Sequence, residues 1–145
     1  MTNIDVENQN SRHNPSDDYV NLIKMYEEKH DQADGMFNGR SLLKFVDLIK
    51  AYLEDNNCKG ILYGEDYHTI TGEIDCPLPE YWNLDEYELF DPGYEKYGKL
   101  PIHKKDAVIC TDVLEHVAEE DLSWVVEEIF SYAKKIVFIN VACFE

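Results

Sequence analysis

The segment that most constrains the fold is residues 106–117, which read DAVICTDVLEHV. Its first half is an apolar run without the polar alternation of a half-exposed strand. Such a run is typical of a strand buried on both faces, as in parallel sheets covered by helices. Asp112 follows the run directly, where α/β sheets place their ligand-binding residues. The segment therefore predicts an α/β fold with a candidate site at one edge of its sheet.

Periodic segments elsewhere predict the remaining elements. Helical spacing of apolar residues predicts helices over residues 17–30, 41–55 and 119–135. Short apolar runs predict further strands at residues 59–64, 87–91 and 136–144. This order of elements predicts a Rossmann-like, mostly parallel sheet of about four strands with helices on both faces.

The domain organisation follows from length and local composition. The 145 residues are enough for one domain. Residues 1–16 are polar and offer little to bury, which predicts a disordered N-terminal arm. Residues 17–145 are predicted to form a single domain. Between residues 65 and 86 the pattern is irregular, and Pro77 and Pro79 exclude a long helix there.

The formal net charge of −17 limits the possible partners. No basic stripe is present, so direct binding of a nucleic-acid backbone is not expected. An acidic surface has two interpretations, which stay open. It provides solubility or adaptation to salt, or it imitates nucleic acid and docks on a basic partner.

The four cysteines indicate the compartment. They lie far apart and form no C-x-x-C pair, which argues against a disulfide framework or a zinc site. Cys110 and Cys143 fall inside apolar runs, where a free thiol behaves as a small core residue. No apolar run reaches the length needed to span a membrane, and the polar N-terminus is no signal peptide. The chain is expected to be intracellular and cytoplasmic, in the host cytoplasm if a phage encodes it.

Several segments, taken in order, resemble class I S-adenosylmethionine-dependent methyltransferases of a small type common in bacteria and phages. The resemblance covers residues 19–144. It rests on a lead-in helix, an acid after the second strand, a fourth motif and the strand that follows it. The corresponding sequences are MFNGRSLL at 36–43, LFDP at 89–92, CTDVLEHV at 110–117 and FINVAC at 138–143.

This resemblance implies S-adenosylmethionine as cofactor and assigns roles to particular residues. Gly64 would form the turn that lets the backbone approach the cofactor, and Asp91 would accept hydrogen bonds from the ribose. Asp112 and Val113 would line the pocket. Glu65 or Asp66 would stand near the ammonium group of the cofactor.

His116 is a candidate general base, because the pKa of a histidine suits that role. Each of these assignments has a structural alternative, which stays open. Gly64 is then an ordinary strand-ending glycine, Asp91 a turn acid before Pro92, Asp112 a helix cap, and His116 structural or simply exposed.

The chain departs from the family in two places. Relatives carry Asp-Tyr-Gly-Cys-Gly-Lys-Gly after the first strand, whereas residues 62–68 read LYGEDYH. Side chains would therefore fill space where the family lets backbone approach the cofactor. The sequence also stops at Glu145, where such enzymes continue with another helix and closing strands. The last strand is thus expected to expose an edge that self-association would cover.

Three functions remain open on the sequence alone. The first is a methyltransferase-like enzyme, active or weakened. The second is a non-catalytic interaction or regulatory module of the same fold. The third is an acidic phage-type inhibitor that docks on a basic nucleic-acid-binding protein. The acids and histidine between residues 65 and 75 have irregular spacing, so no metal site is predicted.

Overall fold

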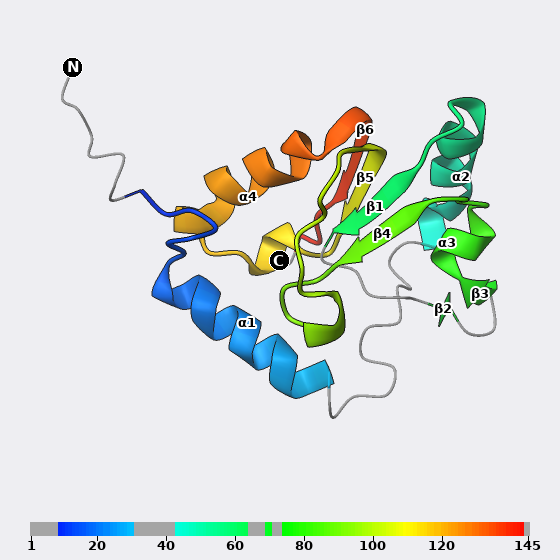
Figure 1. The fold of residues 1–145 in the computed structure, drawn as a ribbon. Coiled ribbons are helices and arrows are strands. Elements are labelled where there is room, and N and C mark those ends of the chain that lie inside the picture. Colours follow the sequence, from blue (N-terminus) through cyan, green and yellow to red (C-terminus); the bar gives the residue numbers. More distant parts are fainter. Residues whose placement is uncertain (1–8, 31–42, 64–68, 71–73, 144–145) are drawn as a thin grey trace, which may run out of the picture.

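The structure is a computed structural model that describes residues 9–30, 43–63, 69–70 and 74–143. Its centre is a four-stranded sheet in the spatial order β4-β1-β5-β6 (Figure 1). All three neighbouring pairs run parallel. The strands are β1 (Gly60–Tyr63), β4 (Tyr87–Phe90), β5 (Lys105–Thr111) and β6 (Ala133–Asn140). The predicted α/β class with a parallel sheet is therefore confirmed.

The central strand β5 explains the two-layered covering of the sheet. Ala107 and Ile109 pack on one face with α2 (Val46–Asp55) and the short helix α3 (Leu78–Tyr81). Val108 and Cys110 point to the other face because side chains alternate along a strand. There they meet residues of α1 (Asp17–His30) and α4 (Glu119–Ser131).

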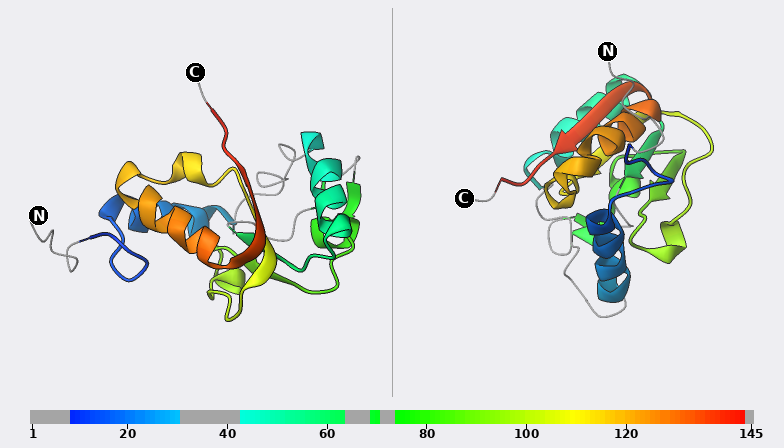
Figure 2. Two further views of the ribbon diagram at one scale, coloured as in Figure 1. Left: turned by 90° about the horizontal axis from the view of Figure 1, so that it is seen from above. Right: turned by 90° about the vertical axis from the view of Figure 1, so that its left-hand side faces the viewer.

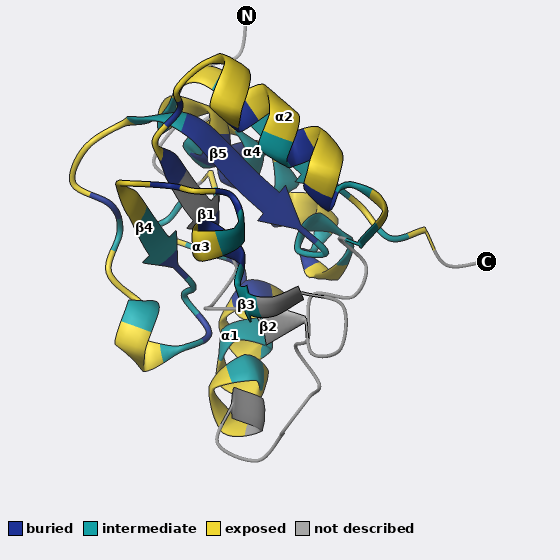
Figure 3. Ribbon diagram, turned by 90° about the vertical axis from the view of Figure 1, so that its right-hand side faces the viewer, coloured by how far each residue is buried: buried dark blue, intermediate teal, exposed yellow. Residues whose placement is uncertain are grey.

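The views agree with this division. Figure 2 shows α1 and α4 on one side of the sheet and α2 on the other. In Figure 3, β5 is buried along most of its length, as the unbroken apolar run predicts. Within the part of the chain that the structure describes, no helix has the length and apolar character needed to cross a bilayer.

The boundary between α4 and β6 differs from the prediction. A helix was expected to reach residue 135, but α4 ends at Ser131 and β6 already begins at Ala133. Parallel pairing with β5 begins at Lys105 and Ala133. Residues 133–135 therefore join the strand, although their local preference is for a helix. At its other end β6 stops at Asn140, and Cys143 is exposed instead of lying inside a strand.

Three small elements precede β4 in a region expected to be irregular. Strands β2 (Thr69–Ile70) and β3 (Ile74–Pro77) pair antiparallel. The helix α3 that follows has only four residues and carries a proline in its first turn, consistent with the exclusion of a long helix. Short 3-10 helices, η3 (Glu95–Tyr97) and η4 (Leu114–His116), follow β4 and β5.

Candidate functional site

The candidate site lies at the carboxyl edge of the sheet, where the strand arrows of β1 and β4 point toward α1 (Figure 1). Asp112 follows β5 with a φ of +53°, which puts its backbone in the left-handed region. Aspartate tolerates this conformation better than a branched residue does. Its backbone N–H donates to the carbonyl oxygen of Asn140 at 3.0 Å. Asp112 thus redirects the chain from β5 into η4 and fixes the end of β6.

Asp91 organises the turn after β4. Its Oδ1 accepts a hydrogen bond from the backbone N–H of Gly93 at 2.8 Å. Its backbone carbonyl accepts from Tyr94 N–H at 3.1 Å, and its N–H donates to Tyr97 O at 2.9 Å. This is the local bonding by which an aspartate stabilises a turn. The geometry accounts for Asp91 as a turn acid, and its role toward ribose stays a prediction.

Helix α1 packs directly on this turn. A Cβ placed on Gly93 would lie 2.6 Å from the Cβ of Tyr26, so only glycine fits the present spacing. The Tyr26 ring also meets His116 edge-on, with centroids 6.0 Å apart. Burial, together with the charges of Glu115 and Asp91, raises the pKa of Tyr26 to about 12. Tyr26 therefore links the turn after β4 to η4 after β5.

Glu115 adds a buried carboxylate to this edge. Its side chain is only 6% exposed, and Oε1 lies 3.8 Å from His116 Nε2. Its Oε2 is buried and has no hydrogen-bond partner among the residues that the structure describes. A buried polar atom of this kind calls for an explanation, and a hydrogen-bond donor of a ligand is one. We name Tyr26, Asp91, Glu115 and His116 the edge cluster.

Two of the predicted site residues lie near Tyr26. The ring of His116 contacts the Tyr26 ring, and the charge of Asp91 acts on the Tyr26 hydroxyl. Val113 is partly buried and packs against the hydrophobic cluster around β5 and α4, and its role in lining a pocket stays a prediction. The predicted cofactor-binding residues Gly64, Glu65 and Asp66 lie outside the described residues. Among the described residues, no three His, Cys, Asp or Glu side chains gather as a metal site.

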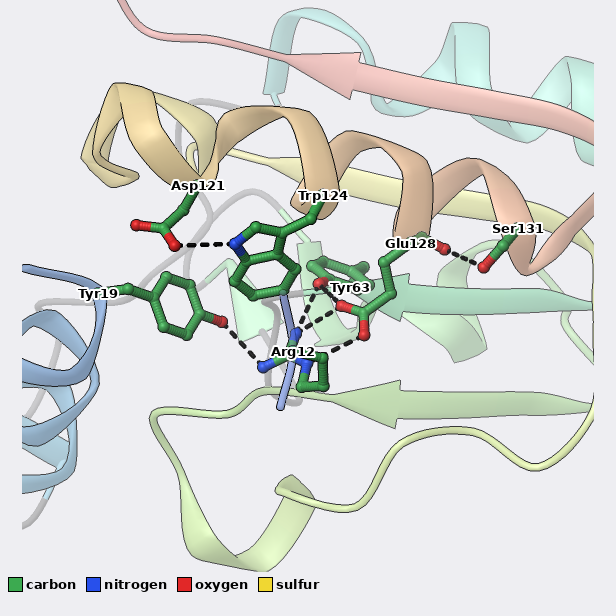
Figure 4. A network of polar contacts seen from close by, with 7 residues as sticks. All are labelled: Arg12, Tyr19, Tyr63, Asp121, Trp124, Glu128 and Ser131. Atoms are coloured by element: carbon green, nitrogen blue, oxygen red, sulfur yellow. Dashed lines mark hydrogen bonds and ion pairs between the residues drawn. The ribbon is translucent and has the colours of Figure 1, made fainter. Parts of the chain in front are cut away.

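A second polar cluster escaped the sequence analysis entirely (Figure 4). The guanidinium of Arg12 donates to both carboxylate oxygens of Glu128, with Nε at 2.9 Å from Oε1. It also donates to the hydroxyl oxygens of Tyr19 and Tyr63, each at 3.0 Å. Tyr63 in turn donates to Glu128 Oε2. Four groups from distant parts of the chain thus share one charge network.

Aromatic rings close around the same guanidinium. The carbon Cζ of Arg12 lies 4.8 Å from the ring centroid of Trp124, 5.4 Å from Phe90 and 5.6 Å from Tyr19. These distances fall within the range of cation–π attraction. We name the surrounding residues the arginine pocket: Tyr19, Tyr63, Phe90, Trp124 and Glu128.

The pKa shifts follow from burial and charge in the arginine pocket. Burial, the largest effect, disfavours the charged form of Arg12. The hydrogen bonds with Glu128 and the electrostatic effects of Tyr63, Tyr19 and Glu128 together outweigh burial and raise the pKa of Arg12. Burial and the charge of Glu128 raise the pKa of Tyr63. The phenol therefore stays protonated and continues to donate to Glu128 while the guanidinium keeps its charge.

The arginine pocket corrects one prediction. Residues 9–16 belong to the segment expected to be a disordered arm, yet they pack against the domain. Ser16 donates from its backbone N–H, at 3.0 Å, and from its hydroxyl to the buried carboxylate of Asp121. Composition averaged over a polar segment could not reveal that one arginine fits a pocket built by four other elements. Residues 1–8 lie outside the described residues.

An apolar groove of about 170 Å³ lies on the opposite face of the sheet. Leu48 and Tyr52 of α2 and Ile136 and Phe138 of β6 contribute to its walls. Leu48 and Tyr52 are more than half exposed. Within the described strands, β6 pairs only with β5, so its other edge has no neighbouring strand among them.

Comparisons with known proteins leave the family open. Family models, curated proteins and solved structures were all compared with the chain, and none of them matches it.

Proposed function

We propose that this chain is a class I S-adenosylmethionine-dependent methyltransferase-like protein with a Rossmann-like sheet, in which catalysis is weakened or lost. The observation that supports this most is the strand order. Numbered along the chain, the four sheet strands lie in the order 2-1-3-4, and the order reverses between β1 and β5. Doubly wound sheets begin in this way and bind ligands outside the carboxyl ends of the strands at the reversal.

The resemblance segments agree with that placement. Asp91 follows β4 and Asp112 follows β5, which are the two neighbours of β1. An acid at the end of β4 is where the family positions its ribose contact. The edge cluster therefore occupies the position expected for a cofactor pocket.

The residues of the edge cluster fit a cofactor only in part. The unpartnered Oε2 of Glu115 is an acceptor suited to an ammonium or hydroxyl group of S-adenosylmethionine. When bound, the cofactor would supply an activated methyl group. His116, 41% exposed beside Glu115, would then accept a proton from the attacking group. Against full activity, Asp91 Oδ1 is already engaged by Gly93.

Isothermal titration calorimetry with S-adenosylmethionine and S-adenosylhomocysteine tests this proposal. We expect binding that Asp91→Ala weakens by about 1–3 kcal/mol, the cost of losing hydrogen bonds to a carboxylate. Asp85→Ala is the matched control, because Asp85 is an exposed carboxylate before the opposite end of β4. The proposal would be overturned if about millimolar ligand produced no heat and no thermal shift, because a functional cofactor site binds far more tightly than that.

A second candidate is a non-catalytic interaction module, favoured by the open edge of β6 and the apolar groove beside it. We propose self-association of two chains through this face, because open edges and exposed apolar patches mark association sites. Tyr52→Glu should lower the association constant measured by sedimentation, and Ile102→Glu should not. Ile102 is the control because it is 85% exposed but does not line the groove. A monomer at all concentrations would contradict this candidate.

A further inference from the structure

The arginine pocket has the features that distinguish a guanidinium from other cations. A guanidinium is planar, with five N–H donors in its plane and two faces that stack on aromatic rings. The pocket offers Glu128 in a two-pronged contact and two phenol oxygens as acceptors. Trp124 and Phe90 supply the ring contacts. A lysine ammonium carries the same charge, but it has no paired in-plane N–H donors and no flat face that stacks on a ring.

The pocket belongs to the domain and not to the segment that fills it. Figure 4 shows wall residues from α1, β1 and α4, and Phe90 adds a wall from β4. Residues 9–15 hold few other polar contacts with the domain among the described residues. One is a hydrogen bond of 3.5 Å from Asn10 to the carbonyl of Glu120. The Ser11–Asn14 bridge is internal to the segment, and His13 and Asn14 are exposed.

The anchor that follows separates the segment from α1. Ser16 is fixed by Asp121, and Tyr19 packs edge-on against Trp124 with ring centroids 4.9 Å apart. These contacts of Ser16 and Tyr19 involve none of residues 9–15, so they would still hold α1 against α4 if that segment left. With Arg12 in place the Glu128 side chain is only 12% exposed, and the departure of residues 9–15 would leave this carboxylate without its cation.

We propose that this pocket is an arginine-recognition site, filled by Arg12 within the chain and by an arginine side chain of a basic partner protein when residues 9–15 leave. A buried carboxylate left without its cation is strongly unfavourable, so one guanidinium must replace another. The net charge of −17 draws positively charged partners toward the molecule. The proposal does not depend on S-adenosylmethionine.

Arg12 competes with any outside arginine because it is tethered next to the pocket. A short flexible tether gives an effective concentration of about millimolar, so free arginine cannot displace it at low concentration. A partner must add contacts of its own around the pocket. The segment therefore acts as a built-in competitor that selects for a basic surface presenting an arginine.

Chemical rescue tests the pocket directly. In Arg12→Ala, ethylguanidinium at about 10 mM, above the effective concentration of the tethered side chain, should raise the melting temperature in a saturable way. Ethylammonium at equal ionic strength should not, and the wild type should respond to neither. Lys59→Ala removes an exposed cation paired with Glu86 and is the matched control, which should show no rescue. A folded Arg12→Ala protein that ethylguanidinium does not stabilise would overturn the proposal and leave Arg12 as a structural clasp.

Peptide titration tests recognition of a partner. A capped Gly-Arg-Gly peptide should bind Arg12→Ala at least about tenfold more tightly than it binds the wild type, because the tethered competitor is gone. The corresponding lysine peptide should bind neither protein, and Glu128→Gln added to Arg12→Ala should abolish arginine binding. Equal affinity for the two peptides would contradict the proposal. If Arg12→Ala does not fold alone, its refolding yield is compared between ethylguanidinium and ethylammonium. A higher yield with ethylguanidinium supports the proposal, and equal yields contradict it.

Discussion

Asp121 is a fully buried carboxylate that joins the start of α1 to α4. It accepts hydrogen bonds from the backbone and hydroxyl of Ser16 and from Trp124 Nε1, the last at 2.8 Å. Asp121→Ala should lower the free energy of unfolding by about 3 kcal/mol, because buried donors lose their acceptor. Urea denaturation measures this loss. Glu120 lies in the same turn of α4 but is exposed, so Glu120→Ala should lower the free energy of unfolding by only about 0.3 kcal/mol. Equal losses for the two variants would be inconsistent with the structure.

The same carboxylate predicts an acid dependence of stability. Burial would raise the pKa of Asp121, but the hydrogen bonds from Ser16 and Trp124 outweigh it, and the pKa lies below its ordinary value. A group with a lowered pKa in the folded state stabilises above its unfolded pKa and loses that contribution as pH falls. The free energy of unfolding should therefore fall below about pH 4. Asp121→Asn should show a flatter pH profile, and parallel profiles would contradict the assignment.

Helix α1 is held at the sheet edge by close contact as well as by polar anchors. The Gly93 turn leaves no room for a Cβ beside Tyr26. Gly93→Ala should therefore displace α1 and cost about 1–3 kcal/mol, the usual effect of overpacking. Gly98→Ala is the control, because its Cβ would meet Glu95 O at an ordinary 3.5 Å. Thermal unfolding of the two variants compares them, and a neutral Gly93→Ala would mean that α1 does not pack as described.

Elements that carry their own signal were predictable. The apolar run of β5 and the apolar stripe of α4 gave the correct element types, and α1 begins at Asp17 as predicted. The α4 boundary was wrong because sheet pairing overrides local preference at residues 133–135. Asp91 and His116 were named as candidates from the sequence, and their roles toward a cofactor stay predictions. Tyr26, which lies near both, was not named, since only the docking of α1 brings it there.

At the scale of the whole molecule, the parallel sheet and its two covering layers follow from patterns that a sequence displays, whereas the strand order was not predicted. The arginine pocket does not, because it joins residue 12 to residue 128 across a separation of 116 positions. No periodicity predicts which side chain of a polar segment fits a pocket of distant aromatic residues. Glu115 had a weak signal, its place beside His116 in the motif, but its buried, unpartnered oxygen is visible only in three dimensions.

The long separation between Arg12 and Glu128 has a kinetic consequence. Closing so large a loop has a high entropic cost before the sheet and α4 have formed. The contact between Arg12 and Glu128 should therefore form after the folding transition state. Arg12→Ala should then speed unfolding while leaving the folding rate nearly unchanged, as chevron plots in urea would measure. A slowed folding rate would place the contact in the folding nucleus instead. During synthesis, residues 9–15 leave the ribosome before the sheet strands do, but they dock on the domain only after the sheet has formed.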